Sequence, residues 1–264
     1  MKIGFIGLGN MAKAIIGGCI KGEIVKASDI TGSAKSRKSM EEARKNFGIN
    51  ISDNRGTAED SDIVVLAVKP QVLEEVLTQI RDIPSGDKKI FLSIAAGKDI
   101  AWLSERLPEN AKIVRCMPNT PALVNEGCSG VCRNVAVTDE EFSLVMKLLE
   151  SFGKAYEIKE SMMDGVVAVS GSSPAYIFML IEAMADGAVL SGLPRKTAIE
   201  MAAQSVLGSA RLLLESGKHP GELKDMVCSP AGTTIEAVRV LEERGFRAAV
   251  IAAEKACAEK NRSL

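Results

Sequence analysis

The sequence predicts an α/β chain of two domains: a domain with a parallel sheet over residues 1–160 and an all-helical domain over residues 161–264. In the first half, short apolar runs recur without polar alternation, as expected of strands covered on both faces. From about Ser161, long apolar helical patterns replace them. The length of 264 residues suffices for two domains that each bury a core.

The first element is a strand at residues 3–6 that runs into the glycine turn of residues 7–12, Gly-Leu-Gly-Asn-Met-Ala. Gly7 permits a tight turn, Gly9 lets the backbone approach a pyrophosphate, and Ala12 is small enough for close helix–strand packing. Backbone N–H groups at the start of the following helix would face the phosphates. Glycine turns also occur as plain structural turns, but the strand before and the helix after predict a Rossmann dinucleotide-binding domain.

The second strand is expected at residues 27–31. The residues at its end indicate whether the domain prefers NADPH or NADH. An NAD-binding domain usually places an acidic residue there to hold the ribose 2′-hydroxyl. This chain has hydroxyls and cations instead, including Ser33, Lys35 and Arg37. Such residues suit a 2′-phosphate and favour NADPH, with NADH as the alternative. The other interpretation of this segment is a solvated charge run that opens a helix ending at Phe47.

The continuous apolar run of residues 62–68 predicts a central strand. Pro70 starts the next helix, expected over residues 71–80, and leaves Lys69 at the carboxyl end of the strand. Ligands bind at that end of parallel sheets, so Lys69 is either a ligand contact or an ordinary loop lysine.

A strand over residues 90–94 ends in Ala95-Ala96-Gly97, whose small side chains would let a flat nicotinamide ring approach. The strand at residues 113–117 is expected to close the series. It ends in a proline-stiffened loop that places Asn119 to hydrogen-bond a ligand. Thr138 and Glu141 predict a capping box for a helix running to Ser151, with Gly153 as its stop.

The second half is expected to be helical. Ser161 with Asp164 resembles a helix cap, and residues 170–176 form a polar break before an apolar helix that ends near Ser191. A further helix is predicted over residues 195–216. Helices this apolar could not cover their own faces, so we expect self-association with a second subunit.

The last functional stretch is Asp225 to Thr234. In it a Ser-Pro-Ala-Gly turn runs into two threonines at the start of a helix ending at Arg244. Unpaired N–H groups and two hydroxyls make an anion site there, suited to a substrate carboxylate. An ordinary helix cap is the alternative. His219, the only histidine, is expected at the surface.

Composition excludes several classes of function. The net charge of −1, with acids and bases interspersed, indicates neither nucleic acid nor membrane as a partner. The six cysteines form no CxxC pair and no metal spacing, so we expect reduced thiols and no metal. The first strand begins at once, without a signal segment, which predicts a cytoplasmic protein.

The chemistry follows by elimination. Carbonyl reduction by a nicotinamide creates an alkoxide and needs an acid beside it. The sequence offers no good candidate for this acid. In particular, no lysine that could serve as the acid occurs between Lys159 and Lys196. Hydride transfer to a protonated imine gives a neutral amine and needs no general acid in that step, so positioning could supply most of the rate.

Six motifs resemble those of the pyrroline-5-carboxylate reductase family and span essentially the whole chain. They are GFIGLGNMA near the start, AVKP at 67–70, SIAAG at 93–97, RCMPNTP at 115–121, SGSSPAY at 170–176 and HPGELKDMVCSPAGTT at 219–234. The resemblance implies NADPH- or NADH-dependent reduction of 1-pyrroline-5-carboxylate to L-proline. It also implies a Rossmann domain and a helical domain that interlocks in a dimer, often assembled into decamers.

The resemblance also implies site residues. Substrate contacts would come from Glu160, Ser172, Thr233 and Thr234, to which Asn119 is added from its loop, with Thr234 and Ser172 as the catalytic pair. The cofactor would contact Ile6, Gly7, Leu8, Gly9, Asn10, Met11, Ser33, Lys35, Arg37, Asn54, Ala67, Val68, Lys69, Pro70, Ala95, Ala96 and Gly97.

Two positions depart from the family pattern. Ser173 stands where the family commonly has glycine, and Met226 where some members have an asparagine that touches the cofactor. Two other functions stay open at this stage: another imine or carbonyl reductase of the same plan, and a non-catalytic nucleotide sensor. The polar loops at Asn119, Ser172 and Thr234 disfavour the sensor, which would not need them.

Overall fold

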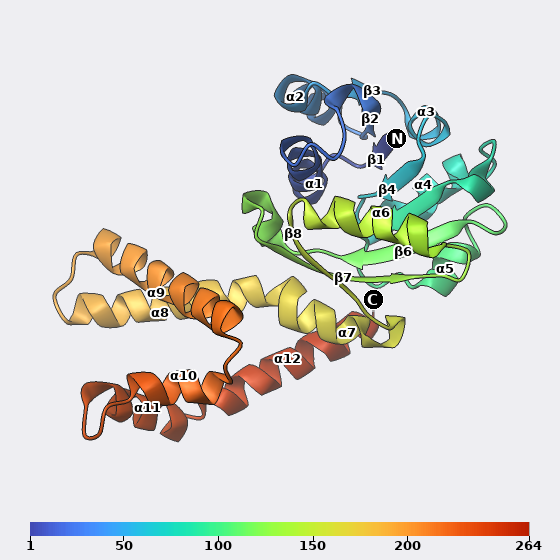
Figure 1. The fold of residues 1–264 in the computed structure, drawn as a ribbon. Helices are drawn as coiled ribbons and strands as arrows, with labels where there is room; N and C mark the ends of the chain where they lie inside the picture. The colour runs from blue at the N-terminus through green and yellow to red at the C-terminus, as the bar shows by residue number, and fades with distance from the viewer. Residues whose placement is uncertain (264) are drawn as a thin grey trace. The chain divides into compact units, whose positions relative to one another are not determined.

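A computed structural model describes residues 1–263. Contacts divide the chain into two units. The first holds Met1–Ser172 together with the last segment from Cys257 onward, and the second holds Ser173–Ala256 (Figure 1). These units are defined by contacts alone, so the domain boundary predicted after residue 160 stays a prediction.

The first unit is built on one eight-stranded sheet in the order β3-β2-β1-β4-β5-β6-β7-β8. Strands β1 to β6 pair in parallel, β7 runs antiparallel to β6, and β8 is parallel to β7. The predicted parallel sheet is therefore confirmed for six strands, whereas the expectation that residues 113–117 close the series is wrong. The strands are β1 (Ile3–Ile6), β2 (Ile30–Ser33), β3 (Asn50–Ile51), β4 (Ile63–Leu66), β5 (Ile90–Ser93), β6 (Lys112–Met117), β7 (Gly127–Arg133) and β8 (Gly153–Glu157).

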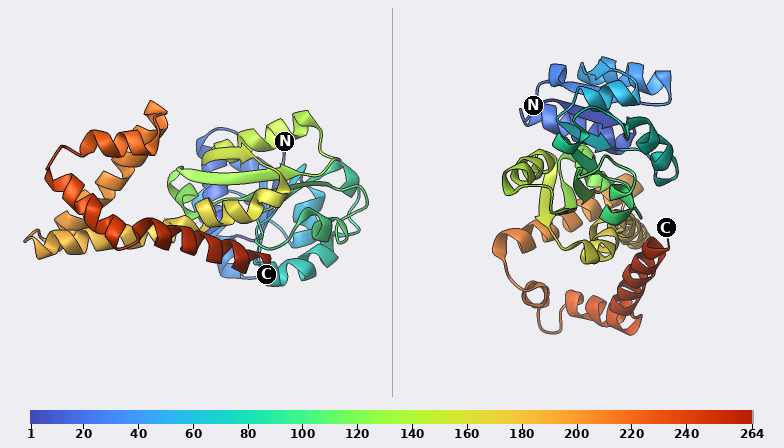
Figure 2. Two further views of the ribbon diagram at one scale, coloured as in Figure 1. Left: turned by 90° about the horizontal axis from the view of Figure 1, so that it is seen from below. Right: turned by 90° about the vertical axis from the view of Figure 1, so that its right-hand side faces the viewer.

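Helices cover both faces of this sheet (Figure 2). Val65 of β4 packs in the core beneath α1 (Asn10–Lys21), α2 (Arg37–Phe47) and α6 (Asp139–Glu150). Its neighbours Val64 and Leu66 pack beneath α3 (Asn54–Glu59), α4 (Pro70–Ile80) and α5 (Ile100–Ser104). Successive side chains of a strand point to opposite faces, which explains why β4 is apolar throughout.

Two local boundaries differ from the prediction. Ala27–Asp29 forms a 3₁₀ turn, and β2 begins only at Ile30, so Ser33 is the last residue of that strand. Helix α6 has the predicted capping box at Thr138 and has Ser151 as its C-cap, but Gly153 opens β8 instead of stopping the helix.

The helical part of the first unit begins at a 3₁₀ turn, Glu160–Met162, followed by α7 (Met163–Val166) and a π-helical segment, Val167–Ser172. No side chain caps α7, so the predicted Ser161–Asp164 cap is wrong. The predicted polar break at residues 170–176 is wrong as well, since helical backbone continues through it. The polar side chains there occupy a widened turn and do not end the helix.

The second unit is all-helical. Its helices are α8 (Ser173–Leu190), α9 (Arg195–Ser216), α10 (Pro220–Val227), α11 (Thr233–Glu243) and α12 (Phe246–Arg262), the last of which continues into the first unit. Helices α8 and α9 pack side by side (Figure 1), and α9 has the predicted bounds.

Apolar side chains of the second unit are exposed in the single chain. Only Ala185 is buried on α8, while Phe178 is 65% and Leu190 is 90% exposed. By length and composition alone, the helical stretch Glu160–Leu190 could cross a membrane, a test that helices of soluble proteins also meet. Such faces fit a helical partner from a second copy of the chain.

Candidate active site

The glycine turn ties three strand ends together. Gly7 has φ +102°, and a Cβ there would lie 2.5 Å from the carbonyl oxygen of Ala67. Its N–H donates to the carbonyl of Ser33 at 2.9 Å, and the N–H of Ala67 donates to the carbonyl of Ile6 at 2.8 Å. Gly9 is the N-cap of α1 and faces open space, because no heavy atom lies within 4 Å of where its Cβ would be. The turn thus leaves room for a bulky ligand at the helix start, near Leu8, Asn10 and Met11.

A polar pair stands at the end of β2. The hydroxyl of Ser33 donates to Oδ1 of Asn54 at 2.7 Å, and Nδ2 of Asn54 donates to Oε1 of Gln79 at 2.7 Å. Lys35 precedes α2 and Arg37 is its first residue; both are exposed, and Arg37 pairs with Glu41 on its own helix. The structure therefore brings Ser33 and Asn54 together and leaves the two cations at the surface.

The ends of β4 and β5 carry the other predicted cofactor contacts. After Ala67 and Val68, the exposed Lys69 is the extended N-cap of α4, and Pro70 is its first residue, as predicted. Ala95 is buried and Ala96 half-buried, and Gly97 has φ +71°.

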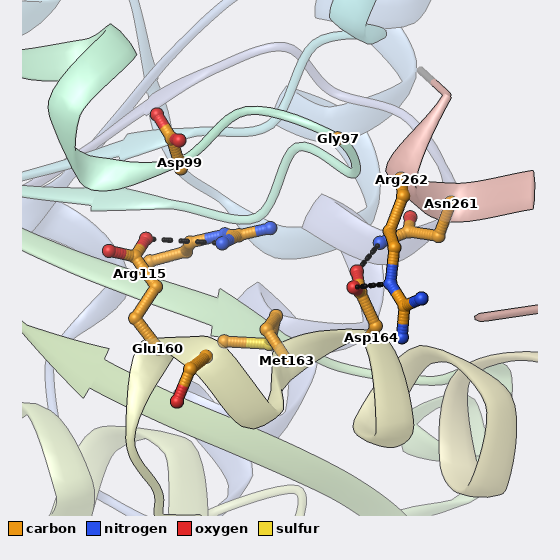
Figure 3. A pocket seen from close by; sticks show the side chains of 9 residues that line it. Gly97, Asp99, Arg115, Glu160, Met163, Asp164, Asn261 and Arg262 are labelled. Atoms are coloured by element: carbon orange, nitrogen blue, oxygen red, sulfur yellow. Dashed lines mark hydrogen bonds and ion pairs between the residues drawn. The ribbon is translucent and has the colours of Figure 1, made fainter. Parts of the chain in front are cut away.

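A cavity of about 400 Å³ lies beside Gly97 within the first unit (Figure 3). Arg115 Nη1 donates to Glu160 Oε1 at 3.1 Å, and the N–H of Ile100 donates to the same oxygen at 2.8 Å. Glu160 is thus fixed by a buried guanidinium and a helix N-terminus. The cavity walls comprise Gly97, Asp99, Arg115, Glu160, Ser161, Met163, Asp164, Asn261 and Arg262.

The far wall of the cavity is held by the end of α12. Asp164 accepts hydrogen bonds from Asn261 Nδ2 at 2.7 Å and Arg262 Nε at 2.7 Å (Figure 3). The bond from Asn261, then the guanidinium of Arg262, hold the pKa of Asp164 below its usual range. Sequence reasoning missed Asn261 and Arg262. The only sequence signal for them is that two adjacent polar residues end an alanine-rich helix.

The structure engages Asn119 and Ser172 in contacts within the first unit. Asn119 is buried, donates from Nδ2 to the carbonyl of Ser170 at 2.9 Å and accepts from the N–H of Cys128 at 2.8 Å. Its amide therefore links the loop after β6 to the π-helical segment. Ser172 Oγ accepts a hydrogen bond from Cys257 Sγ at 3.1 Å.

Thr233 and Thr234 belong to the second unit, as the first two residues of α11. Gly232 is the N-cap, no side chain caps the helix, and Ala231 before it has φ +55°. Within residues 1–263 neither threonine hydroxyl has a hydrogen-bond partner. His219, expected at the surface, is exposed and caps α10 by accepting from the N–H of Gly221.

The three buried thiols, of Cys19, Cys116 and Cys132, are unsuited to nucleophilic catalysis. Burial raises the pKa of Cys116 to about 12, and the pKa values of Cys19 and Cys132 to about 11. All six cysteines are free. In the part of the chain that the structure describes, no group of three or more His, Cys, Asp or Glu side chains could hold a metal ion.

Family models match both halves of the chain. A model described as pyrroline-5-carboxylate reductase dimerisation matches residues 160–264. A model described as NADP oxidoreductase, coenzyme F420-dependent, matches residues 2–97.

Curated relatives match along the full length. The chain is 51% identical to pyrroline-5-carboxylate reductase of Escherichia coli strain K12 over 264 residues, which cover 100% of this chain and 98% of that protein. It is 44% identical to the enzyme of the same name from Methanosarcina acetivorans, with 100% and 97% covered. Among solved structures, the Plasmodium falciparum pyrroline carboxylate reductase with NADP bound matches with a TM-score of 0.90 and 35% identity, covering 100% of this chain and 97% of that one.

Proposed function

The chain belongs to the pyrroline-5-carboxylate reductase family, and from this premise we propose how its residues reduce the C=N bond of 1-pyrroline-5-carboxylate to give L-proline. It is an NADP-dependent oxidoreductase. The observation that carries the assignment of residues is the shared cavity of the first unit. Gly97, expected beside the nicotinamide, and Glu160, expected beside the substrate, both line it.

The first unit fits a dinucleotide. Gly7 cannot carry a side chain, and Gly9 leaves free space in front of the N–H groups that start α1. A pyrophosphate fits there because these donors and the helix dipole both favour an anion. We propose that Ser33 and Asn54 contact the ribose and its 2′-phosphate, and that the cations Lys35 and Arg37 lie near that phosphate. The remaining cofactor contacts are assigned to Ile6, Leu8, Asn10, Met11, Ala67, Val68, Lys69, Pro70, Ala95, Ala96 and Gly97.

We assign the substrate carboxylate to Thr233 and Thr234. Their hydroxyls have no partner within residues 1–263, and they stand at an uncapped start of α11. Glu160 is held by Arg115 and Ile100 and would face the substrate from the cavity wall. Ser172 is assigned a hydrogen bond to the substrate. The bonds of Asn119 to two backbone groups support a positioning role for it.

The chemistry asks little of the side chains beyond positioning. NADPH, when bound, supplies a hydride to the imine carbon. Because the imine nitrogen already carries a proton, the product is a neutral amine and no residue has to donate a proton in that step. Thr234 and Ser172 would hold the ring in line for attack, and such positioning is worth up to about 7–11 kcal/mol in well-oriented reactions.

Assembly and location complete the proposal. The second unit holds most of the residues matched by the dimerisation model, and its apolar faces are exposed in the single chain. We propose that the dimers join further into decamers, as the family resemblance implies. The protein is a soluble metabolic enzyme by family, and we propose the cytoplasm as its compartment.

The test is NADPH oxidation with 1-pyrroline-5-carboxylate, compared with other cyclic imines and with carbonyl compounds. Thr234→Ala is expected to lose about 1–3 kcal/mol of substrate-binding free energy through lost hydrogen bonds, which raises KM roughly 5- to 150-fold. Thr234→Ser keeps the hydroxyl and is expected to retain most of the activity. Unchanged kinetics in Thr234→Ala would remove this residue from the site.

A further inference from the structure

Gln79 accepts a hydrogen bond from a residue assigned to the cofactor. It belongs to α4, and its side chain lies on the exposed side of that helix. Its Oε1 lies 2.7 Å from Nδ2 of Asn54, the first residue of α3. The two helices pack together, and Nη2 of Arg55 donates to the carbonyl of Asp82, just beyond α4, at 3.3 Å. This packing places Gln79 beside Asn54.

The orientation of the Asn54 amide is set by Ser33. That serine is 2% exposed, and its hydroxyl donates to Oδ1 of Asn54 at 2.7 Å. In the described part of the chain this hydroxyl donates to no other acceptor. A turned amide would present Nδ2 to it, which only donates, and the buried hydroxyl hydrogen would lose its acceptor at a cost in stability. Oδ1 therefore faces Ser33, and Nδ2 faces Gln79.

Gln79 completes this arrangement and leaves one donor unused. Because Nδ2 of Asn54 only donates, it needs an acceptor on its side, and the amide oxygen of Gln79 supplies one. Nδ2 carries two N–H groups, and the second has no acceptor within residues 1–263. Asn54 is half-buried and so retains exposed surface, unlike Ser33. Its amide thus keeps an N–H for a ligand.

The place of this N–H in the fold indicates the ligand group. Ser33, to which Asn54 is bonded, is the last residue of β2. In a Rossmann domain the end of the second strand lies beside the 2′ position of the adenosine ribose. A hydrogen bond from an N–H to a charged phosphate oxygen is stronger than one to a neutral hydroxyl. Asn54 therefore offers a donor where NADP⁺ and NAD⁺ differ.

We propose that Gln79 is a positioning residue for NADP⁺ recognition: by accepting from Nδ2 it holds Asn54 so that the second N–H of that amide donates to the 2′-phosphate. The inference rests on the proposed function, which assigns Asn54 to this part of the cofactor. Gln79 acts through Asn54 and does not have to touch the cofactor. It contributes to the preference for NADP⁺ over NAD⁺, because only NADP⁺ carries the 2′-phosphate.

The test compares the affinities for NADP⁺ and NAD⁺ by calorimetry on the full chain. Gln79→Met removes the acceptor and should weaken NADP⁺ binding about 10-fold, the lower end for a hydrogen bond to a charged group, and leave NAD⁺ binding unchanged. Gln79→Glu keeps an acceptor and should retain most of the preference, although its negative charge alone would oppose a phosphate. Thr78→Met is the matched control, since Thr78 is exposed on the same helix and its hydroxyl bonds to the carbonyl of Glu74. It should keep the natural preference.

A second comparison shows whether Gln79 acts through Asn54. In a chain that already carries Asn54→Ala, the further change Gln79→Met should leave the affinity for NADP⁺ where Asn54→Ala alone puts it, because no amide remains to be positioned.

Three results would overturn the inference. Gln79→Met could keep the natural ratio of the two affinities, Gln79→Glu could lose as much NADP⁺ affinity as Gln79→Met, or Gln79→Met could cost as much without Asn54 as with it. Each leaves the proposed function intact, which fails only if the natural chain does not bind NADP⁺ or does not reduce the cyclic imine.

Discussion

Gly9→Ala is expected to leave the fold intact and to damage cofactor binding. Gly9 has φ −76° and ψ −176°, which alanine adopts freely, and its Cβ would meet no protein atom within 4 Å. Alanine is a poorer N-cap than glycine, but it also restricts the unfolded chain. The two effects oppose each other, so the free energy of unfolding should change by less than about 1 kcal/mol.

The loss in binding comes from the new methyl group, which would occupy the space through which a pyrophosphate reaches the N–H groups of α1. A hydrogen bond to a charged group is worth about 1.5–3 kcal/mol, so each one lost raises the Kd for NADP⁺ about 10- to 150-fold. Urea denaturation without cofactor measures the stability, and calorimetric titration measures the Kd.

Gly7→Ala is the matched control. Its φ of +102° and the 2.5 Å approach to the carbonyl of Ala67 should cost at least about 2 kcal/mol in unfolding free energy, from backbone strain and overpacking. The reasoning is refuted if Gly9→Ala binds NADP⁺ as tightly as the natural chain, or if Gly7→Ala is equally stable.

Three further substitutions test other parts of the molecule. Glu160→Gln leaves the guanidinium of Arg115, whose side chain is 9% exposed, without a countercharge. The free energy of unfolding, measured by thermal denaturation, should fall by about 1–3 kcal/mol. The double variant that also carries Arg115→Met should recover part of this loss. Asp164→Asn tests a lowered pKa: the stability that the carboxylate provides is complete above its unfolded pKa of about 3.9 and is lost as the pH falls through the folded value. The difference in Tm between the natural chain and Asp164→Asn should therefore be constant above about pH 5 and shrink below about pH 4; a difference that persists at low pH contradicts this. Phe178→Asp should convert dimers to monomers in light scattering, whereas Val135→Asp, at a fully exposed valine of the first unit, should leave the mass unchanged.

The elements that the sequence predicts well are those with one dominant local signal. The run at 63–66 is a strand because both faces are buried, and α9 is a long run rich in good helix formers with glycine just past its end. Strands β7 and β8 lack such a signal. β7 is rich in glycine and cysteine, β8 is mostly polar, and β8 lies at the edge of the sheet, where one side needs no apolar cover.

The site divides in the same way. The glycine turn is predictable because its function requires glycine at positions that are local in sequence. The cavity is not, because Arg115, Asp164 and Asn261 come from three segments that only the fold brings together. The polar stretch around Ser172 predicts a break, because small polar residues favour turns, whereas the helix widens there and retains them.

The π-helical segment Val167–Ser172 has an evolutionary consequence. A π turn holds one residue more than an α turn, so it can arise by inserting a single residue into an existing helix. The widened turn absorbs the extra residue, whereas an insertion or deletion in a regular α-helix rotates the side chains beyond it by about 100°, the angle per residue at 3.6 residues per turn. Deleting one residue of the segment would restore a regular turn and move the carbonyl of Ser170, which accepts from Asn119. Length changes within this helix should therefore be rarer among descendants of this gene than changes of residue type.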